Sequence, residues 1–382
     1  MDTATIRTKN VDSGLDVTKT RRIIIAGGGT GGHIFPAIAI ANAIVYEQAA
    51  TEILFIGAKG KMEMEKVPQA GYTIKGITIA GFNRKSLLKN ILLPFKLMKS
   101  FIQVRNIINT FKPDAVIGVG GYSSFPVLRY AQAKGIPSFI HESNSFAGKS
   151  NMLLGKKAVK IFVATDHMEK FFPKEKIMIT GNPVRKAIAE STTGREEGIR
   201  FFGLDERKRT ILAVGGSLGA RTINEALVSG LDELDTHSLQ LIWQTGKIGS
   251  AVYQSAGRAH SNVWVNEFIR EMEMAYAAAD IIISRAGAMS VSELCVAGKP
   301  AILVPYPYAA EDHQTFNAKS LVDKKAAIMV KDGEAAEKLV STLIDLSNNE
   351  PLQSELKKNI RALAVVNADE IIAKEILNYI SE

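Results

Sequence analysis

Short apolar runs rich in β-branched residues alternate along this chain with longer segments whose apolar residues recur every three to four positions. The short runs are typical of buried strands, and the longer segments, such as Ile34–Ala49 and Val127–Ala133, are typical of helices. This alternation predicts parallel sheets covered by helices on both sides. The predicted strands are Arg22–Ala26, Ile53–Ile56, Ile74–Ile79, Ala115–Tyr122, Pro137–Glu142, Ile161–Ala164, Ile177–Thr180, Thr210–Val214, Leu239–Thr245, Val263–Val265, Ile281–Ser284, Ala301–Pro305 and Ala327–Val330.

A glycine loop follows a predicted strand twice, once in each half of the chain. Gly27–His33 comes after the first strand, and Gly215–Arg221 comes after Thr210–Val214. Each loop leads into a predicted helix, so its backbone N–H groups lie at a helix N-terminus, where anions bind. The repetition predicts an α/β fold with two Rossmann-like, doubly wound domains that face each other and hold a phosphate-bearing ligand between them.

The segment Gly181–Arg185 interrupts the alternation of predicted strands and helices, and the domain boundary is predicted here. We expect a loose N-terminal extension over residues 1–20, a first domain over 21–184 and a second over 185–364. The tail Ser354–Ser381 is expected to be helical, and its end, about residues 365–382, is expected to pack back on the first domain.

Composition excludes several classes of protein. The chain has 382 residues, 46% of them hydrophobic, which is ordinary for a globular protein with two domains. The single cysteine, Cys295, excludes an internal disulfide framework and a multi-cysteine metal site, and we interpret it as a small buried residue. No run reaches the ~18 apolar residues of a membrane-spanning helix, and the polar N-terminus does not resemble a signal peptide. The chain is therefore expected to stay in the cytoplasm.

Positive charge is concentrated in the first half. Residues 1–185 hold 26 Lys and Arg against 12 Asp and Glu, whereas the remainder holds 21 against 27. From Lys66 to Pro113, both included, there are nine basic residues, no acidic residue and many apolar ones, such as Phe95 and Ile102. Such a segment suits an anionic membrane surface, although an ordinary helix with solvated lysines would show the same pattern. No motif supports nucleic-acid binding, which we do not expect.

Polar residues gather where predicted strands end, which is where ligands bind in open α/β sheets. His33 follows the first glycine loop and is a candidate general base, kept neutral by the helix N-terminus; its alternative role is a helix cap. Tyr122 and Glu142 follow two other strands of the first domain. The glycine pattern fits a dinucleotide fingerprint only weakly, because no acidic residue ends the following strand.

The second half offers groups suited to a nucleotide. Ser217 and Arg185 are candidates for a diphosphate, although Arg185 would also suit a salt bridge in the linker. Glu293 falls in the first turns of a helix, where a carboxylate can accept hydrogen bonds from a ribose diol or simply favour the helix dipole. Gln314 follows Asp312, which is a candidate N-cap, and could bind sugar hydroxyls. No third ligand accompanies Asp312 and His313, so no metal site is expected.

Together these residues resemble the peptidoglycan N-acetylglucosaminyltransferase (MurG) family, from about Arg22 to the C-terminus. The matching blocks are Gly27–Pro36, Gly118–Phe125, His141–Gly148, Gly181–Arg185, Gly215–Asn224, Phe268–Asp280, Arg285–Glu293 and Asp312–Asn317. The resemblance implies the GT-B arrangement. It also implies inverting transfer of N-acetylglucosamine from UDP-N-acetylglucosamine to the 4-hydroxyl of the muramyl sugar of lipid I, giving lipid II for peptidoglycan, without a cofactor or tightly bound metal.

The resemblance also implies roles for residues. Glu293 would hold the ribose, Ser217 and Arg185 the diphosphate, Ile269 the uracil and Gln314 the sugar hydroxyls. The acceptor would bind the first domain near His33, Tyr122 and Glu142, with His33 the first candidate base and Glu142 the second. The full set of implied donor contacts is Thr30, Gly31, Gly32, Asn144, Arg185, Ser217, Ile269, Ala288, Met289, Ser290, Val291, Ser292, Glu293 and Gln314.

The implied partners agree with the charge pattern. Lipid I is a polyprenyl diphosphate in an anionic bilayer, so the basic first half is expected to dock peripherally on the cytoplasmic face of the membrane, beside proteins of cell-wall synthesis and division. Competing hypotheses are a UDP-N-acetylglucosamine 2-epimerase or a glycolipid galactosyltransferase of the same architecture. A nucleotide-dependent oxidoreductase and a non-catalytic protein that binds the nucleotide sugar are further alternatives.

Overall fold

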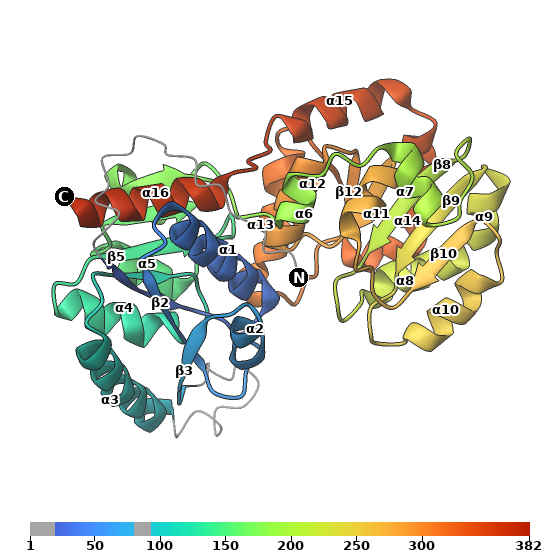
Figure 1. Cartoon of the computed structure of the whole chain (residues 1–382). Helices are drawn as coiled ribbons and strands as arrows, with labels where there is room; N and C mark the ends of the chain where they lie inside the picture. Colours follow the sequence, from blue (N-terminus) through green and yellow to red (C-terminus); the bar gives the residue numbers. More distant parts are fainter. Residues whose placement is uncertain (1–19, 80–92) are drawn as a thin grey trace, which may run out of the picture.

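The computed structural model describes residues 20–79 and 93–382, which form two lobes side by side (Figure 1). The expected extension over residues 1–20 lies outside the described residues except for Thr20. The 80–92 part of the basic apolar segment also lies outside them.

The first lobe is built on a parallel sheet of seven strands in the order β3-β2-β1-β4-β5-β6-β7. The interior strand β1 shows that this sheet is covered on both faces. Its residues Ile23, Ile24 and Ile25 are all fully buried, and alternate side chains pack in different hydrophobic clusters. The elements of this lobe are β1 (Arg22–Ala26), α1 (Gly31–Glu47), β2 (Glu52–Ala58), α2 (Glu63–Gln69), β3 (Thr73–Ile77), α3 (Leu93–Phe111), β4 (Ala115–Gly118), α4 (Ser124–Ala133), β5 (Ser138–Glu142), α5 (Lys149–Gly155), β6 (Lys160–Val163), η2 (Met168–Lys170), η3 (Lys174–Lys176) and β7 (Ile177–Ile179).

The second lobe repeats this plan with six parallel strands in the order β10-β9-β8-β11-β12-β13. Ile281 and Ile283 pack in one hydrophobic cluster and Ile282 in another, so this sheet is also covered on both faces. The elements are α6 (Lys186–Ala189), α7 (Arg195–Phe201), β8 (Arg209–Val214), α8 (Arg221–Ser229), α9 (Leu231–Thr236), β9 (Leu239–Gln244), α10 (Ser250–Arg258), β10 (Val263–Asn266), α11 (Met272–Ala278), β11 (Ile281–Ser284), α12 (Ala288–Ala297), β12 (Ala301–Leu303), η4 (Ala310–Asp312), α13 (His313–Val322), β13 (Ile328–Met329), η5 (Asp332–Glu334), α14 (Ala335–Ser347) and α15 (Glu350–Arg361).

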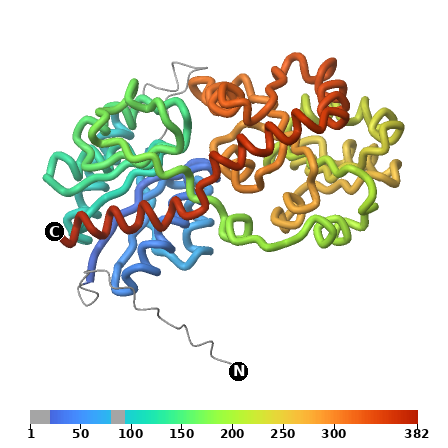
Figure 2. Tube along the Cα trace, turned by 90° about the horizontal axis from the view of Figure 1, so that it is seen from above, coloured from blue at the N-terminus to red at the C-terminus, as the bar shows by residue number. Residues whose placement is uncertain are grey.

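The chain passes between the lobes twice, and the two passages touch. The first lies near Gly181, and the second lies between α15 and α16 (Ala368–Ser381), whose red tube returns to the first lobe in Figure 2. A Cβ added at Gly181 would collide with the side chain of Val365, so the passages are packed together. Ile372 and Ile376 of α16 are buried in the first lobe beside α1.

The C-terminal tail forms two helices that belong to different lobes. The tail was expected to be helical over Ser354–Ser381; the structure has α15, which ends at Arg361, and α16, which starts at Ala368. The periodicity of apolar residues continues across the gap, whereas the two helices pack on different lobes. Sequence periodicity does not report which body a helix covers.

Candidate active site

The first glycine loop, Gly27–His33, runs from the end of β1 into the first turn of α1, where it places His33. Gly28 and Gly29 have φ angles of 137° and 91°, which glycine adopts without a steric penalty. Nδ1 of His33 hydrogen-bonds to the carbonyl oxygen of Gly28 at 3.2 Å and lies 3.3 Å from Oγ1 of Thr30. Because a carbonyl oxygen only accepts, Nδ1 carries the proton in this bond and Nε2 keeps its lone pair.

The surroundings of His33 favour the neutral imidazole. Burial lowers its pKa, while the carboxylate of Glu142, the hydrogen bond to Gly28 and, to a smaller extent, Glu63 raise it; His313 adds to the lowering. Burial is therefore the largest cause of the lowered pKa, in place of the helix N-terminus to which the sequence analysis attributed it. His313 starts α13, so a side chain of the second lobe acts on the candidate base of the first.

The carboxyl group of Glu63, at the start of α2, holds the first glycine loop. Oε2 accepts a hydrogen bond from the N–H of Gly29 at 2.8 Å, and Oε1 accepts one from Ala58 at 2.9 Å. The side chain is buried, and a Cβ added at Gly28 or Gly57 would collide with it. Sequence reasoning missed Glu63, because no local pattern distinguishes it from the exposed acid two positions later.

Glu142 ends β5 and organises the loop that follows. Oε1 accepts hydrogen bonds from the backbone N–H (3.1 Å) and the side-chain amide (3.3 Å) of Asn144, and Oε2 accepts from Gly148 N–H (3.1 Å) and Asn151 Nδ2 (2.8 Å). The carboxylate is buried and its acceptor sites are occupied. Tyr122, in contrast, is 56% exposed in the loop after β4.

Two asparagine side chains connect this loop to the second lobe. Asn317 on α13 accepts a hydrogen bond from Ser145 N–H at 2.9 Å and donates to the carbonyl oxygen of Ala286 at 3.1 Å and to Oδ1 of Asn144 at 3.3 Å. Asn182 donates to the carbonyl oxygen of Ser143 and to Oγ of Ser292 at the start of α12. Sequence reasoning gave neither asparagine a role of its own, since their partners come from distant parts of the chain.

Arg185 and Glu293, predicted to bind different parts of the donor, are paired with each other. The guanidinium Nε donates to Oε1 of Glu293 at 2.9 Å and Nη2 to Oε2 at 3.1 Å. The hydroxyl of Tyr276 also donates to Oε2, at 3.1 Å. Burial raises the pKa of Tyr276 well above its usual value, and the charge of Glu293 raises it further, so this hydroxyl keeps its proton.

Of the other predicted donor residues, Thr30, Gly31 and Gly32 lie in the first lobe, at the N-cap and in the first turn of α1, and the rest lie around the ends of the strands of the second sheet. Ser217 is exposed in the second glycine loop, and no hydrogen bond joins its side chain to the other candidates among the described residues. Ile269 is buried, with its N–H bonded to Gln244 Oε1 at 3.0 Å, and Gln314 Oε1 accepts from Tyr306 N–H at 2.9 Å. Ala288, Met289, Ser290, Val291 and Ser292 form the first turns of α12, whose leading N–H groups have no acceptor within the helix.

The described part of the chain offers neither a metal cluster nor a membrane-spanning helix. Within residues 20–79 and 93–382, no group of three or more His, Cys, Asp and Glu side chains is placed to hold a metal ion. No helix in the same ranges combines the length and hydropathy needed to cross a membrane.

The chain matches both halves of one family of enzymes. Residues 23–163 match the glycosyltransferase family 28 N-terminal domain, and residues 210–373 match the C-terminal domain of the same family. A protein of Phocaeicola vulgatus named UDP-N-acetylglucosamine–N-acetylmuramyl-(pentapeptide) pyrophosphoryl-undecaprenol N-acetylglucosamine transferase is 54% identical over 359 residues, which cover 93% of this chain and 95% of that protein. A protein of the same name from Cytophaga hutchinsonii is 49% identical, with 95% and 98% covered.

Solved structures agree at the level of the fold. MurG of Acinetobacter baumannii superposes with a TM-score of 0.76 at 30% sequence identity, covering 94% of this chain and 99% of that one. A UDP-N-acetylglucosamine 2-epimerase of Listeria monocytogenes, described as putative, superposes with a TM-score of 0.64 at 13% identity, with 94% and 95% covered. The second match shows a shared fold alone.

Proposed function

This chain belongs to glycosyltransferase family 28 and within it to the MurG enzymes, and from that premise we propose how its two lobes divide the reaction. The protein is a UDP-N-acetylglucosamine-dependent transferase that moves N-acetylglucosamine to lipid I and forms lipid II in peptidoglycan synthesis. We assign the acceptor to the first lobe, residues 21–184 with the helix near 365–382. The donor is assigned to residues 185–364.

The observation that carries the catalytic assignment is the contact of His33 Nδ1 with the carbonyl oxygen of Gly28 at 3.2 Å. Its Nδ1–H donates to the carbonyl oxygen of Gly28, so the lone pair of Nε2 remains available to the acceptor. In the proposed step, the 4-hydroxyl of the muramyl sugar gives its proton to Nε2 as its oxygen attacks the anomeric carbon. The bond from that carbon to the diphosphate breaks, UDP leaves, and the configuration inverts.

We assign Glu142 a positioning role. Its carboxylate accepts four hydrogen bonds from its own loop and from α5, and taking a proton there would weaken them. It also raises the pKa of His33, which opposes the effect of burial. Glu142 therefore supports the base and holds Asn144, whose side chain meets Asn317 of the donor lobe.

Donor binding requires the Arg185–Glu293 pair to change partners. We propose that the ribose hydroxyls donate to Glu293 in place of the guanidinium, and that Arg185 then contacts the diphosphate. Ser217 and the first turn of α12 add donors to the same diphosphate, which spreads its growing charge as UDP departs. Ile269 and Gln314 would contact the uracil and the sugar. The linker near Asn182 would act as the hinge that brings the lobes together.

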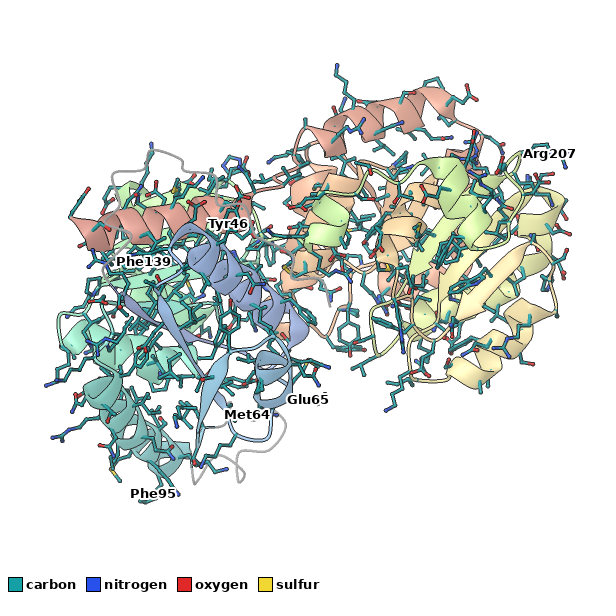
Figure 3. All side chains as sticks on the ribbon, viewed as in Figure 1. Tyr46, Met64, Glu65, Phe95, Phe139 and Arg207 are labelled. Carbon is teal, nitrogen blue, oxygen red and sulfur yellow. The ribbon has the colours of Figure 1, made fainter. Side chains whose placement is uncertain are left out.

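Membrane docking is proposed through α3. Phe95, Met98 and Ile102 recur along one side of this helix and are 65%, 60% and 57% exposed, with Lys99 and Arg105 exposed on the same helix. Figure 3 shows Phe95 at the outer end of α3. Exposed apolar side chains among cations suit an anionic bilayer, so we place the protein peripherally on the cytoplasmic face of the membrane. Proteins of cell-wall synthesis and division are the partners expected there.

The catalytic assignment is tested by transfer of radiolabel from UDP-N-acetylglucosamine to a short-chain lipid I analogue. His33→Ala is expected to lower kcat by about 10²–10⁴-fold with little change in the KM for UDP-N-acetylglucosamine. His167→Ala is the matched control, since that imidazole is 78% exposed and lies just before η2, away from the glycine loops. A His33→Ala enzyme as fast as the control would refute the base assignment.

Docking is tested by sedimentation with vesicles that contain anionic lipid. Phe95→Ser with Met98→Ser is expected to release the protein into the supernatant. Ile248→Ser removes an equally exposed apolar side chain from the second lobe and is expected to change nothing. Equal binding of both variants would refute docking through α3.

A further inference from the structure

We propose that Glu63 is a positioning residue of the transfer reaction, whose carboxylate fixes the first glycine loop and whose charge supports His33 as the proton acceptor. This inference rests on the proposed role of His33.

The first argument is geometric. Glu63 is only 1% exposed, yet no Lys or Arg side chain of residues 20–79 and 93–382 forms an ion pair with its carboxyl group. Both oxygens accept hydrogen bonds from backbone N–H groups, of Ala58 and of Gly29. Burying a carboxylate is costly unless such charge-assisted bonds compensate it. Gly28 and Gly57 leave the space that the Glu63 side chain fills, so this side chain packs directly against the backbone of the first glycine loop and of β2.

The second argument follows the contacts from Glu63 to His33. Glu63 holds the N–H of Gly29, and the preceding residue, Gly28, supplies the carbonyl oxygen that accepts Nδ1–H of His33. If Gly29 moves, this carbonyl oxygen moves with it, and the imidazole loses the bond that fixes its tautomer. A displacement of about 1 Å at a reacting group is enough to cost on the order of 10²-fold in rate.

The third argument is electrostatic. Glu142 at the end of β5 and Glu63 on α2 raise the pKa of His33, whereas burial and His313 on α13 lower it. His141 on β5 is also close, but burial lowers its pKa to about 4, so it is neutral at neutral pH. When Nε2 takes the proton, the imidazolium is stabilised by the two carboxylates. Removing the charge of Glu63 therefore makes His33 a weaker base.

Glu63→Gln tests both effects, because glutamine keeps the shape but replaces one accepting oxygen by an NH₂ group that faces a backbone N–H. We expect kcat to fall by about 10–100-fold, with the KM for UDP-N-acetylglucosamine changed less than about twofold. The acid limb of the kcat–pH profile should move to lower pH, because loss of the carboxylate lowers the pKa of His33.

Glu65→Gln is the matched control, since it removes the same charge from the same helix. Glu65 is labelled on α2 in Figure 3; its side chain is 67% exposed and is paired with Lys66. This variant should match the wild type in kcat and in the position of the acid limb. Glu63→Asp provides a second test if Glu63→Gln does not fold. Aspartate keeps the charge but has a shorter side chain, so kcat should fall while the acid limb of the kcat–pH profile stays in place.

The outcomes separate this inference from the proposed function. If Glu63→Gln behaves as Glu65→Gln does, or loses activity without moving the acid limb, the inference is overturned. Wild-type kcat in Glu63→Asp would overturn the loop-fixing role. A wild-type rate and acid limb in His33→Ala would instead overturn the base assignment, whatever the Glu63 variants show.

Discussion

Gly120 lies directly against the imidazole of His33, so one added methyl group there tests the placement of the candidate base. Its φ is +95°, and a Cβ would stand 2.7 Å from Cδ2 and 2.8 Å from Nε2 of His33. Carbon atoms prefer separations of about 3.5–4.0 Å, so in Gly120→Ala the ring has to retreat by about 1 Å. A shift of that size is expected to lower kcat by about 10²-fold. The strained backbone should add a loss of about 1–2 kcal/mol in the free energy of unfolding.

The backbone effect is measured separately with Gly135→Ala. Gly135 follows α4 with a φ of +71°, and a Cβ there has no neighbour within 4 Å. The two variants should lose similar stability in urea unfolding, whereas only Gly120→Ala should lose transfer activity. Both kcat values are obtained with labelled UDP-N-acetylglucosamine and a lipid I analogue. If Gly120→Ala is as active as Gly135→Ala, the contact between Gly120 and His33 does not position the base, and the reasoning fails.

Three further predictions concern the second lobe and the titration of buried groups. Glu293→Gln should raise the KM for UDP-N-acetylglucosamine by about 10-fold or more, and an unchanged KM would contradict the ribose assignment. The same variant should lower the free energy of unfolding by only about 1 kcal/mol, because the Arg185 side chain that pairs with Glu293 is 42% exposed. Burial lowers the pKa of His141 to about 4, so below pH 6.5 the unfolded chain binds a proton that the native protein does not. Stability should fall by about 2 kcal/mol from pH 7 to pH 5 in urea unfolding, and His141→Gln should lose less over that range. Burial raises the pKa of Cys295 to about 12, so a thiol reagent at pH 8 should label it only after unfolding; rapid labelling of the native protein would contradict this.

The local pattern was sufficient to predict most elements of both sheets. Runs such as Ile23–Ile25 and Ile281–Ile283 are buried on both faces, and a strand buried on both faces is continuously apolar. The glycine loops were equally clear, since glycine and a following helix are local features. The position of His33 in the first turn of α1 followed from the same local information.

The site itself depends on contacts that sequence spacing does not contain. Arg185 and Glu293 were assigned to the diphosphate and the ribose, and only the folded chain shows that they pair across 108 positions. Glu63 and Glu65 have the same side chain and lie on one short helix, yet one holds the glycine loop and the other faces water.

The sequence by itself therefore determined the two parallel sheets and the two glycine loops that lead into helices, because buried strands and glycine turns are encoded within a few residues. It also determined the family, through short blocks of residues. Only the tertiary structure decided which carboxylate supports His33, which one orders the 143–148 loop and which one pairs with Arg185. Partners in these contacts come from separate strands and helices, and the hydrogen bonds available to a buried carboxylate are set by the backbone that surrounds it.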